Sequence, residues 1–319
     1  MTVLRIALIL IALAASAQAS SQEFPSRPIR ILNGFQAGGP PDIALRKIAS
    51  GLEARPGQPV VVENRVGATG TIAASAVARA EPDGHTLLFG VAANMAVAPA
   101  MMANPPYDPA KAFSPVIEVA RGPYVWVVRA DAPARTLPEF IAWSRQNPGK
   151  LNYASPGLGS VHHLSTELFK QAAGLHIVHV PYKGGMYVAL IAGEVQGMFE
   201  SMPGPLPHIE AGKVRALGVT GNRRLRVLPD VPTFAEQGVA DNDVSSWWGV
   251  VGPAGMPEAI VARLNAEIAA ILADPELRTT MSKWGIEPTP GTPESFGSHI
   301  RQESTRWKER VARFAVKPE

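Results

Sequence analysis

The chain has 319 residues, of which 46% are hydrophobic, and its 30 Lys and Arg against 27 Asp and Glu give a formal net charge of +3. The absence of cysteine excludes disulfides, thiolate metal sites and a lipid-anchored cysteine. The small basic excess favours a solvated surface over a nucleic-acid-binding face, and the length is sufficient for two lobes of ordinary size.

The first residues have the pattern of a secretory signal peptide. Arg5 precedes an apolar run over residues 6–15, and Ala17-Gln18-Ala19 fits a small-x-small cleavage site. The run is too short for a membrane anchor, and no later segment reaches the roughly 18 uninterrupted apolar residues that a membrane span needs. We therefore predict a signal peptide over residues 1–19, cleavage near Ala19 and a soluble periplasmic product.

Strand-like and helix-like segments alternate through the rest of the chain. We expect strands over residues 29–33, 60–63, 86–90, 115–119, 124–129, 151–154, 177–180, 195–199, 216–220 and 248–252. We expect helices over 42–54, 71–80, 137–146, 160–173 and 185–192, and only helical patterns from 257 onward, including a long C-terminal helix. This alternation predicts an α/β protein with mostly parallel sheets.

Two segments have the features of crossings between lobes. Residues 115–129 are long for one strand and are interrupted by Gly122-Pro123, and residues 230–246 are rich in proline and polar side chains. A chain that leaves a lobe and later returns gives a discontinuous first lobe, here 24–122 with 242–319, around a second lobe of 123–241. Trp247 and Trp248 close the second crossing, and we expect at least one of them to pack in the core or hinge.

A glycine- and proline-rich loop follows the first expected strand and precedes a helix. With Gly39 as the N-cap, Pro40 and Pro41 are the first two helical positions and Asp42 is the third, where it can accept a hydrogen bond from the Gly39 amide. The helix dipole and free amides at this point suit an anion. The expected donors are the N–H groups of Ala37, Gly38, Gly39 and Ile43. The alternative is an ordinary turn in which the glycines only permit the backbone geometry.

A second loop of the same kind spans residues 153–163. Ser160 is the natural N-cap of the next helix, Ser155 and Ser160 offer hydroxyl groups, and the amides of residues 159–162 are expected to point out of the helix start. His163, at the third helical position, either lines a ligand site or bonds a neighbouring backbone group. Glu200 follows a strand end, where ligand sites of α/β proteins usually form.

Signals for catalysis and for metal binding are weak. No Gly-x-Ser-x-Gly elbow is present, so Ser160, His163 and Asp42 form no recognisable triad. His176 and His179 lie at an odd offset on a strand and have no acidic pair to complete a metal site. We expect no enzyme activity, no cofactor and no metal.

Matches to one family run in order over essentially the whole mature chain. They include residues 25–30 (PSRPIR), the 35–42 loop, 61–65 (VVENR), 82–88 (PDGHTLL), 107–109 (YDP), 148–155 (PGKLNYAS), 179–184 (HVPYKG) and 228–233 (LPDVPT). This pattern strongly resembles the Bug-type extracytoplasmic solute receptors, the binding proteins of tripartite tricarboxylate transporters. It is specific for the family and not for the ligand.

The resemblance implies a two-lobed, type II periplasmic binding protein of the Venus-flytrap kind with a ligand cleft between the lobes. It implies a small carboxylate ligand, gripped by the two loops through backbone amides and ordered waters, and membrane permease subunits of a tripartite tricarboxylate-type transporter as partners of a monomer. The expected ligand-binding residues are Phe35, Ala37, Gly38, Gly39, Asp42, Ala93, Ser155, Gly159, Ser160, His163 and Glu200. The alternatives are a periplasmic hydrolase that uses Ser160 or Ser155 with His163, and a soluble receptor for a sensor kinase.

The chain departs from the family pattern at two positions. Relatives usually carry Ser or Thr where Pro41 stands, and often Gly-Asn-Gly-Ser where Gly157-Leu158-Gly159-Ser160 stands. Pro41 removes an amide and a hydroxyl, and Leu158 replaces a polar side chain by an apolar one. The resulting hypothesis is a preference for a less charged or partly apolar ligand, such as an aromatic or longer-chain monoacid, over citrate-like triacids.

Overall fold

The computed structural model describes residues 24–55, 58–240 and 242–313, so the predicted signal peptide lies outside the described residues. The first segments are β1 (Ile29–Asn33), α2 (Pro40–Glu53), β2 (Val60–Asn64), η1 (Ala68–Gly70), α3 (Thr71–Ala78), β3 (Thr86–Val91), the π-helical η2 (Ala93–Val97) and α4 (Ala98–Met101). After the long β4 (Phe113–Arg129) come α5 (Leu137–Gln146), β5 (Asn152–Ser155), α6 (Val161–Ala173), β6 (Val178–Pro181), α7 (Met186–Ala192), β7 (Met198–Ser201), α8 (Leu206–Glu210), β8 (Val214–Val219) and η3 (Ala235–Gln237). The chain ends with β9 (Ser245–Pro253), α9 (Glu258–Leu272), α10 (Pro275–Lys283), β10 (Glu287–Pro288) and α11 (Pro293–Arg313).

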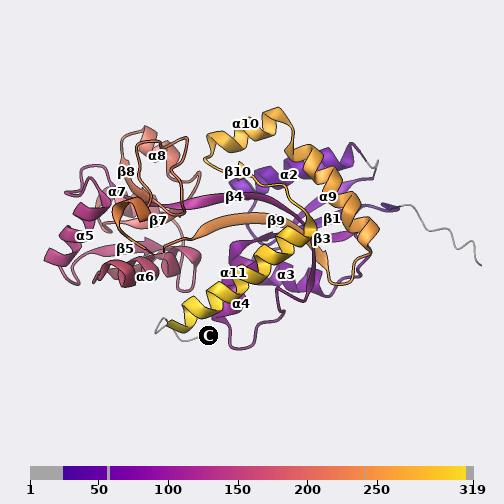
Figure 1. The fold of residues 1–319 in the computed structure, drawn as a ribbon, viewed down its shortest axis with the longest axis horizontal. Helices are drawn as coiled ribbons and strands as arrows, with labels where there is room; N and C mark the ends of the chain where they lie inside the picture. The colour runs from indigo at the N-terminus through magenta and orange to yellow at the C-terminus, as the bar shows by residue number, and fades with distance from the viewer. Residues whose placement is uncertain (1–23, 56–57, 241, 314–319) are drawn as a thin grey trace, which may run out of the picture.

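Two lobes are joined by β4 and β9, which run side by side between them (Figure 1). The main sheet has the order β10-β4-β9-β3-β1-β2, and β7 and β8 pair with the far part of β4. Along β4, Phe113–Pro123 pairs with β9, whereas Tyr124–Arg129 pairs with β7 and β8. The pairing thus changes within one continuous strand, and the prediction of two strands split at Gly122-Pro123 is wrong. The lobe limits of 24–122 with 242–319 and of 123–241 stay a prediction.

The strand directions differ from the prediction of mostly parallel sheets. Only β1 with β2, β1 with β3, and β5 with β6 pair in parallel among the described strands. Every pairing of β4 or β9 is antiparallel. The cause is the crossing itself, because a chain that leaves a lobe along β4 and returns along β9 must run in opposite directions on adjacent strands.

Each lobe has its own packed interior. In the second lobe, Trp126 is fully buried and meets the rings of Phe140, Phe169 and Phe199 edge-on at 5.1–5.3 Å between centroids. In the first lobe, α2 packs against α9 and β2, and α9 also packs against β4. The C-terminal helix α11 packs along β4 through buried residues such as Phe296 and Trp307, as predicted for a long C-terminal helix. The short strand β10 makes the expectation of only helices after 257 wrong.

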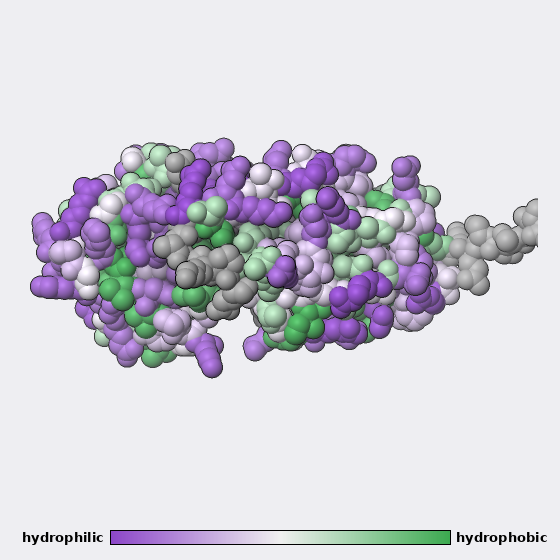
Figure 2. All heavy atoms as spheres, turned by 90° about the horizontal axis from the view of Figure 1, so that it is seen from below, coloured by the Kyte–Doolittle hydropathy of each residue, from purple (hydrophilic) through white to green (hydrophobic). Residues whose placement is uncertain are grey.

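Side-chain caps fix several helix starts. The Thr136 hydroxyl accepts a hydrogen bond from the Glu139 amide at 3.3 Å, and the Asp274 carboxylate accepts one from the Leu277 amide at 2.9 Å. The face in Figure 2 is mainly hydrophilic, and its apolar residues form separate groups. Within the described ranges, no helix combines the length and the apolar character needed to cross a bilayer.

Candidate functional site

A cavity of about 440 Å³ lies between the two lobes. It is lined by Phe35, Pro41, Thr69, Val91, Ala92, Ala93, Tyr124, Pro156, Gly157, Leu158, Ser160, Val161, His162, Ser246 and Trp248. This lining contains no Asp, Glu, Lys or Arg from the part of the chain that the structure describes. A charged ligand group must therefore be met by backbone dipoles, hydroxyls or the one imidazole.

The topology brings these residues together at strand ends. The parallel strands β1, β2 and β3 end at the same edge of the sheet, and the segments that follow them supply Phe35, Thr69 and Ala93. In the other lobe, β5 leads into the loop that carries Pro156 and Leu158. The crossing strands add Tyr124 and Trp248 as aromatic walls. Both glycine-rich loops that the sequence singled out thus border one cavity.

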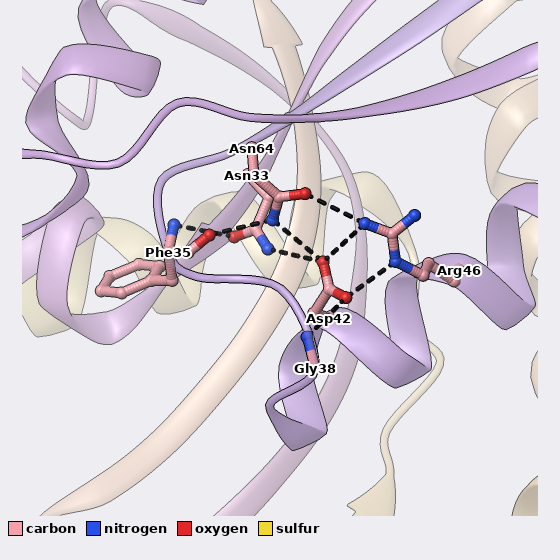
Figure 3. Close-up of polar contacts among 6 residues, drawn as sticks. All are labelled: Asn33, Phe35, Gly38, Asp42, Arg46 and Asn64. Atoms are coloured by element: carbon pink, nitrogen blue, oxygen red, sulfur yellow. Dashed lines mark hydrogen bonds and ion pairs between the residues drawn. The ribbon is translucent and has the colours of Figure 1, made fainter.

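Asp42 organises the first loop through its polar contacts (Figure 3) and does not itself line the cavity. Its side chain is 2% exposed, and Oδ2 accepts hydrogen bonds from the Gly38 amide at 3.0 Å and from Nε of Arg46 at 2.8 Å. Oδ1 accepts hydrogen bonds from the side-chain amides of Asn33 at 3.3 Å and Asn64 at 3.0 Å. Burial alone would raise the pKa of Asp42, but these donors outweigh it and lower the pKa to about 2.

The expected hydrogen-bond partners of this loop need correction. Gly39 is the N-cap of α2, as predicted, but Asp42 accepts its bond from the Gly38 amide and not from that of Gly39. The Ile43 amide bonds the Gly39 carbonyl at 3.0 Å, so Gly38 and Ile43 are not free donors. The amides of Ala37 and Gly39 have no hydrogen-bond partner among the described residues.

The second loop leaves the amides at its helix start free. Ser160 is the N-cap of α6, as predicted: its hydroxyl accepts a hydrogen bond from the His163 amide at 3.2 Å and donates one to the Gly157 carbonyl at 2.8 Å. The amides of Val161 and His162, the first two helical positions, donate to no atom of the described chain. Both residues line the cavity, so the positive end of the α6 dipole opens onto it.

His163 lies behind the cavity in a stack of rings. Its Nδ1 accepts a hydrogen bond from the Gly159 amide at 3.2 Å, which is the bonding to a neighbouring backbone group that the sequence left open. Its ring centroid is 4.4 Å from that of His179, whose Nε2 is 2.6 Å from the Ser155 hydroxyl. Burial lowers the pKa of His163, and burial together with the neighbouring His163 lowers the pKa of His179 to about 4. The two imidazoles therefore stay neutral and structural near pH 7.

These contacts bear on the alternative of a hydrolase that uses Ser160 or Ser155 with His163. Ser155 is fully buried and its hydroxyl lies 2.6 Å from Nε2 of His179, so Ser155 does not form the pair with His163 on which one form of this alternative depends. The Ser160 hydroxyl is used as a helix cap between a carbonyl and an amide. Ser160 has no imidazole nitrogen as a hydrogen-bond partner among the described residues, and neither Ser155 nor His179 lines the cavity, so no serine–imidazole pair faces the space where a substrate would bind.

Glu200 stands in a second layer behind His162. Its Oε1 is 3.0 Å from Nε2 of His162, and its Oε2 accepts a hydrogen bond from the Tyr187 hydroxyl at 3.1 Å. The ring of Tyr124 meets that of His162 edge-on at 5.2 Å. Burial and the Glu200 charge raise the pKa values of Tyr124 and Tyr187, so both phenols stay protonated.

The predicted residues therefore fall into two groups. Phe35, Ala93 and Ser160 line the cavity, whereas the rest lie in the loop backbones or in the layer behind: Ala37, Gly38, Gly39, Asp42, Ser155, Gly159, His163 and Glu200. Whether any of them touches a ligand stays a prediction.

The sequence reasoning missed several lining residues, chiefly Thr69, Tyr124, His162 and Trp248. A usable signal for Thr69 is the pair Gly67 and Gly70 directly after β2, at a strand end. Ala68 and Thr69 have φ values of 45° and 55°, the left-handed region that non-glycine residues enter at a cost. Aromatic residues beside the lobe crossings are the corresponding signal for Tyr124 and Trp248.

Comparison with known proteins places the chain in a family. The model of the tripartite tricarboxylate transporter family receptor matches residues 44–315. Protein BugT of Bordetella pertussis is 36% identical over 295 residues, which cover 92% of this chain and 90% of BugT. This agreement confirms the Bug-type resemblance that the sequence motifs indicated.

Solved structures give the same result for the fold. Rpa4515 of R. palustris, solved with adipate, superposes with a TM-score of 0.82 at 37% identity, covering 91% of this chain and 98% of that one. The periplasmic binding protein BugD superposes with a TM-score of 0.80 at 33% identity, covering 93% of this chain and all of BugD. The predicted two-lobed binding-protein fold is confirmed, and the chain belongs to the tripartite tricarboxylate transporter receptor family.

Proposed function

We propose that this protein is a periplasmic solute-binding protein that captures a small carboxylate in the cavity between its lobes. The observation that carries the proposal is the start of α6, where the amides of Val161 and His162 are unpartnered and border a cavity without lining Lys or Arg. A carboxylate at this point satisfies both amides and the helix dipole. The amides of Ala37 and Gly39 supply further donors from the opposite lobe.

The ligand class follows from the remaining lining. Phe35, Tyr124 and Trp248 offer ring surfaces, and Pro41 and Leu158 add apolar surface at positions where polar groups would suit a multiply charged acid. The ligand is therefore a carboxylate with an apolar or aromatic body, preferred over citrate-like triacids. The relatives support the carboxylate class, since Rpa4515 was solved with adipate.

The captured ligand passes to membrane permease subunits of a tripartite tricarboxylate-type transporter. Family membership supports this delivery step, and the signal-like pattern of residues 1–19 supports export with cleavage near Ala19. The protein acts as a monomer and catalyses no reaction. A turnover of simple esters that is abolished by Ser160→Ala would contradict the absence of catalysis.

The most direct test identifies the ligand. Small molecules released from the purified mature protein are analysed by mass spectrometry, and a thermal-shift panel of mono-, di- and tricarboxylates follows. We expect acids with one carboxylate and an apolar body to give the largest rise in Tm. A released ligand without an acid group would contradict the carboxylate site, and citrate binding at least as tightly as every monoacid would contradict the preference.

A second test addresses the first loop. A Cβ added at Gly39 would meet only Pro41 Cδ, at 3.8 Å, so we expect Gly39→Leu to fold normally while placing bulk beside the free Gly39 amide. We expect loss of carboxylate binding with an unchanged Tm. Gly184→Leu is the control, because the space around Gly184 is open and Gly184 does not line the cavity. Full binding by Gly39→Leu would show that this loop is structural only.

A further inference from the structure

Among the described residues of the second lobe, His162 is the titratable group besides Tyr124 that lines the cavity, and a chain of hydrogen bonds holds it in place. The Tyr187 hydroxyl donates to Glu200 Oε2 at 3.1 Å, and Glu200 Oε1 lies 3.0 Å from His162 Nε2. The Tyr187 ring is itself stacked on His208 with centroids 4.0 Å apart. A Cβ added at Gly204 would lie 2.8 Å from Glu200 Oε2, so the carboxylate is closely packed from that side as well.

This chain fixes which nitrogen of His162 carries a proton. Ionised carboxylate oxygens only accept hydrogen bonds, so the contact at Glu200 requires a hydrogen on Nε2. In the neutral ring, Nδ1 is then an acceptor, and it has no hydrogen-bond partner among the described residues. The side chain of His162 is 18% exposed and lines the cavity. An acceptor is thus available to a ligand at this wall.

The charges around His162 argue against a second ligand carboxylate at the same place. The groups that face the ring are Glu200 from β7, and the uncharged phenols of Tyr124 from β4 and, through Glu200, of Tyr187 from α7. No Lys or Arg lines the cavity in the described chain to balance two carboxylates. A neutral group with a hydrogen to donate satisfies Nδ1 without meeting the Glu200 charge.

We propose that His162, oriented by Glu200 and Tyr187, is a specificity-determining residue that selects a monocarboxylate carrying a neutral hydrogen-bond donor, such as a hydroxyl group, at its far end. The inference rests on the proposed function, in which the α6 and α2 loops hold the ligand's carboxylate. His162 accepts a hydrogen bond from the other end of the ligand. A dicarboxylate of the same length is disfavoured by the Glu200 carboxylate directly behind the imidazole.

Three acids of equal chain length test this selection: hexanoate, 6-hydroxyhexanoate and adipate. Their Kd values are measured by calorimetry at pH 8 on the purified mature protein. We expect 6-hydroxyhexanoate to bind roughly tenfold more tightly than hexanoate, the worth of one hydrogen bond, and more tightly than adipate. In His162→Leu, the ratio of the hexanoate to the 6-hydroxyhexanoate Kd should fall close to one. In Glu200→Gln, the disadvantage of adipate relative to 6-hydroxyhexanoate should shrink by roughly tenfold.

Matched controls use residues outside the cavity. His176→Leu removes an exposed histidine, and Glu194→Gln alters a carboxylate that accepts a bond from the Tyr182 hydroxyl at 3.2 Å, which copies the Tyr187–Glu200 pairing on the surface. Both controls should keep the wild-type Kd ratios. If Glu200→Gln fails to fold, Tyr187→Phe provides the second variant, because it removes one of the hydrogen bonds that hold Glu200 against His162 and should lower the ratio of the hexanoate to the 6-hydroxyhexanoate Kd.

The outcomes separate this inference from the function on which it rests. If none of a broad panel of carboxylates, the three probes included, binds to the wild-type protein, the proposed function fails. If hexanoate and adipate bind as tightly as 6-hydroxyhexanoate, or if the ratios do not change in His162→Leu and Glu200→Gln, carboxylate capture stands and the role of His162 is overturned.

Discussion

The two glycine-rich loops of the cavity share a sequence pattern and differ in what they leave available. Both run from a strand end through glycines into a helix start. At α2, two prolines occupy the first two helical positions, so their amides do not exist, and Asp42 takes up the Gly38 amide. At α6, Ser160 caps the third position and the amides of Val161 and His162 stay free.

The difference shows that a helix start is an anion site only to the extent that its amides are present and unpartnered. The α2 loop is a rigid wall, braced by Asp42 with Arg46 and Asn64, which also holds the Phe35 carbonyl at 2.9 Å. We expect the α6 loop to be the stronger donor, because its two free amides lie at the helix start itself. A ligand's carboxylate is therefore expected nearer to α6, with the α2 loop setting the shape of the opposite side.

The largest effect should come from making the α6 start resemble the α2 start. Val161→Pro removes one free amide at a helical position where proline is well tolerated, and Ser160 already has the extended backbone that a following proline requires. We expect carboxylate affinity to fall by about 1.5–3 kcal/mol, as measured by calorimetry. Val161→Ala, which keeps the amide, is the control, and equal losses in both variants would contradict the role of the amide.

The hydrogen bonds that Asp42 makes in the α2 loop should contribute to the free energy of unfolding, and this contribution should depend on pH. Asp42→Asn should lower the free energy of unfolding at pH 7 by about 2 kcal/mol, because the pKa of Asp42 lies near 2 in the fold against its ordinary 3.8. Folding favours the ionised form, so this contribution is complete above about pH 4 and is lost as the pH falls towards 2. Urea denaturation at pH 7, 4 and 3 measures the difference.

The control for Asp42→Asn is a carboxylate on the protein surface. Asp131→Asn alters an exposed carboxylate that pairs with Arg129, and it should change the unfolding free energy by under about 0.5 kcal/mol. If the free energy of unfolding of the wild-type protein exceeds that of Asp42→Asn by the same amount at pH 7, 4 and 3, ionisation of Asp42 is not the source of the difference.

Restoring a hydrogen-bond donor at the start of α2 should raise ligand affinity, by less than Val161→Pro lowers it. Pro41→Ser returns one amide and one hydroxyl to a residue that lines the cavity, so citrate and other multiply charged acids should gain affinity by about 1 kcal/mol. Pro275→Ser makes a related change at the start of α10, away from the cavity, and should leave every Kd unchanged. No gain for any polyacid would show that missing donors at α2 do not set the preference.

The smallest effect on ligand affinity is expected at Leu158, in the loop that precedes α6. Leu158 is 62% exposed, so Leu158→Asn should leave Tm nearly unchanged and weaken the binding of apolar monoacids by only about 0.5 kcal/mol. Val188→Asn, on the exposed face of α7, is the matched control without an effect on binding. Tighter binding of apolar monoacids to Leu158→Asn would contradict the contribution of Leu158 to ligand preference.

Much of the fold could be predicted from the sequence, because helix starts and turns depend on interactions between residues that are neighbours in the chain. The strand–glycine–helix order and the N-caps Gly39 and Ser160 were predicted correctly, since capping depends on a few neighbouring residues. The continuity of β4 through Gly122-Pro123 was not predicted, because the residues of β9 that pair with this part of β4 lie more than 100 residues away in the sequence. The antiparallel crossings were missed for the same reason.

The site was predictable as two loops and less so as individual side chains. The choice between His162 and His163 depends on which ring the fold turns towards the cavity, and the stack with His179 and the bond from Gly159 turn His163 away. Thr69 and Trp248 reach the cavity from other strands, and one sequence without tertiary contacts does not place them. The donor count at each loop likewise required knowing that Asp42 takes the Gly38 amide.

The continuity of β4 has a mechanical consequence. Lobes joined by flexible loops can pivot freely, but here a hydrogen-bonded ribbon of β4 and β9 passes from one lobe towards the other, and its pairing continues through two register shifts as far as Pro123 and Ser245. Any rotation of one lobe against the other must twist that ribbon and strain its hydrogen bonds. We therefore expect the ribbon to resist twisting and so to limit how far one lobe can rotate against the other.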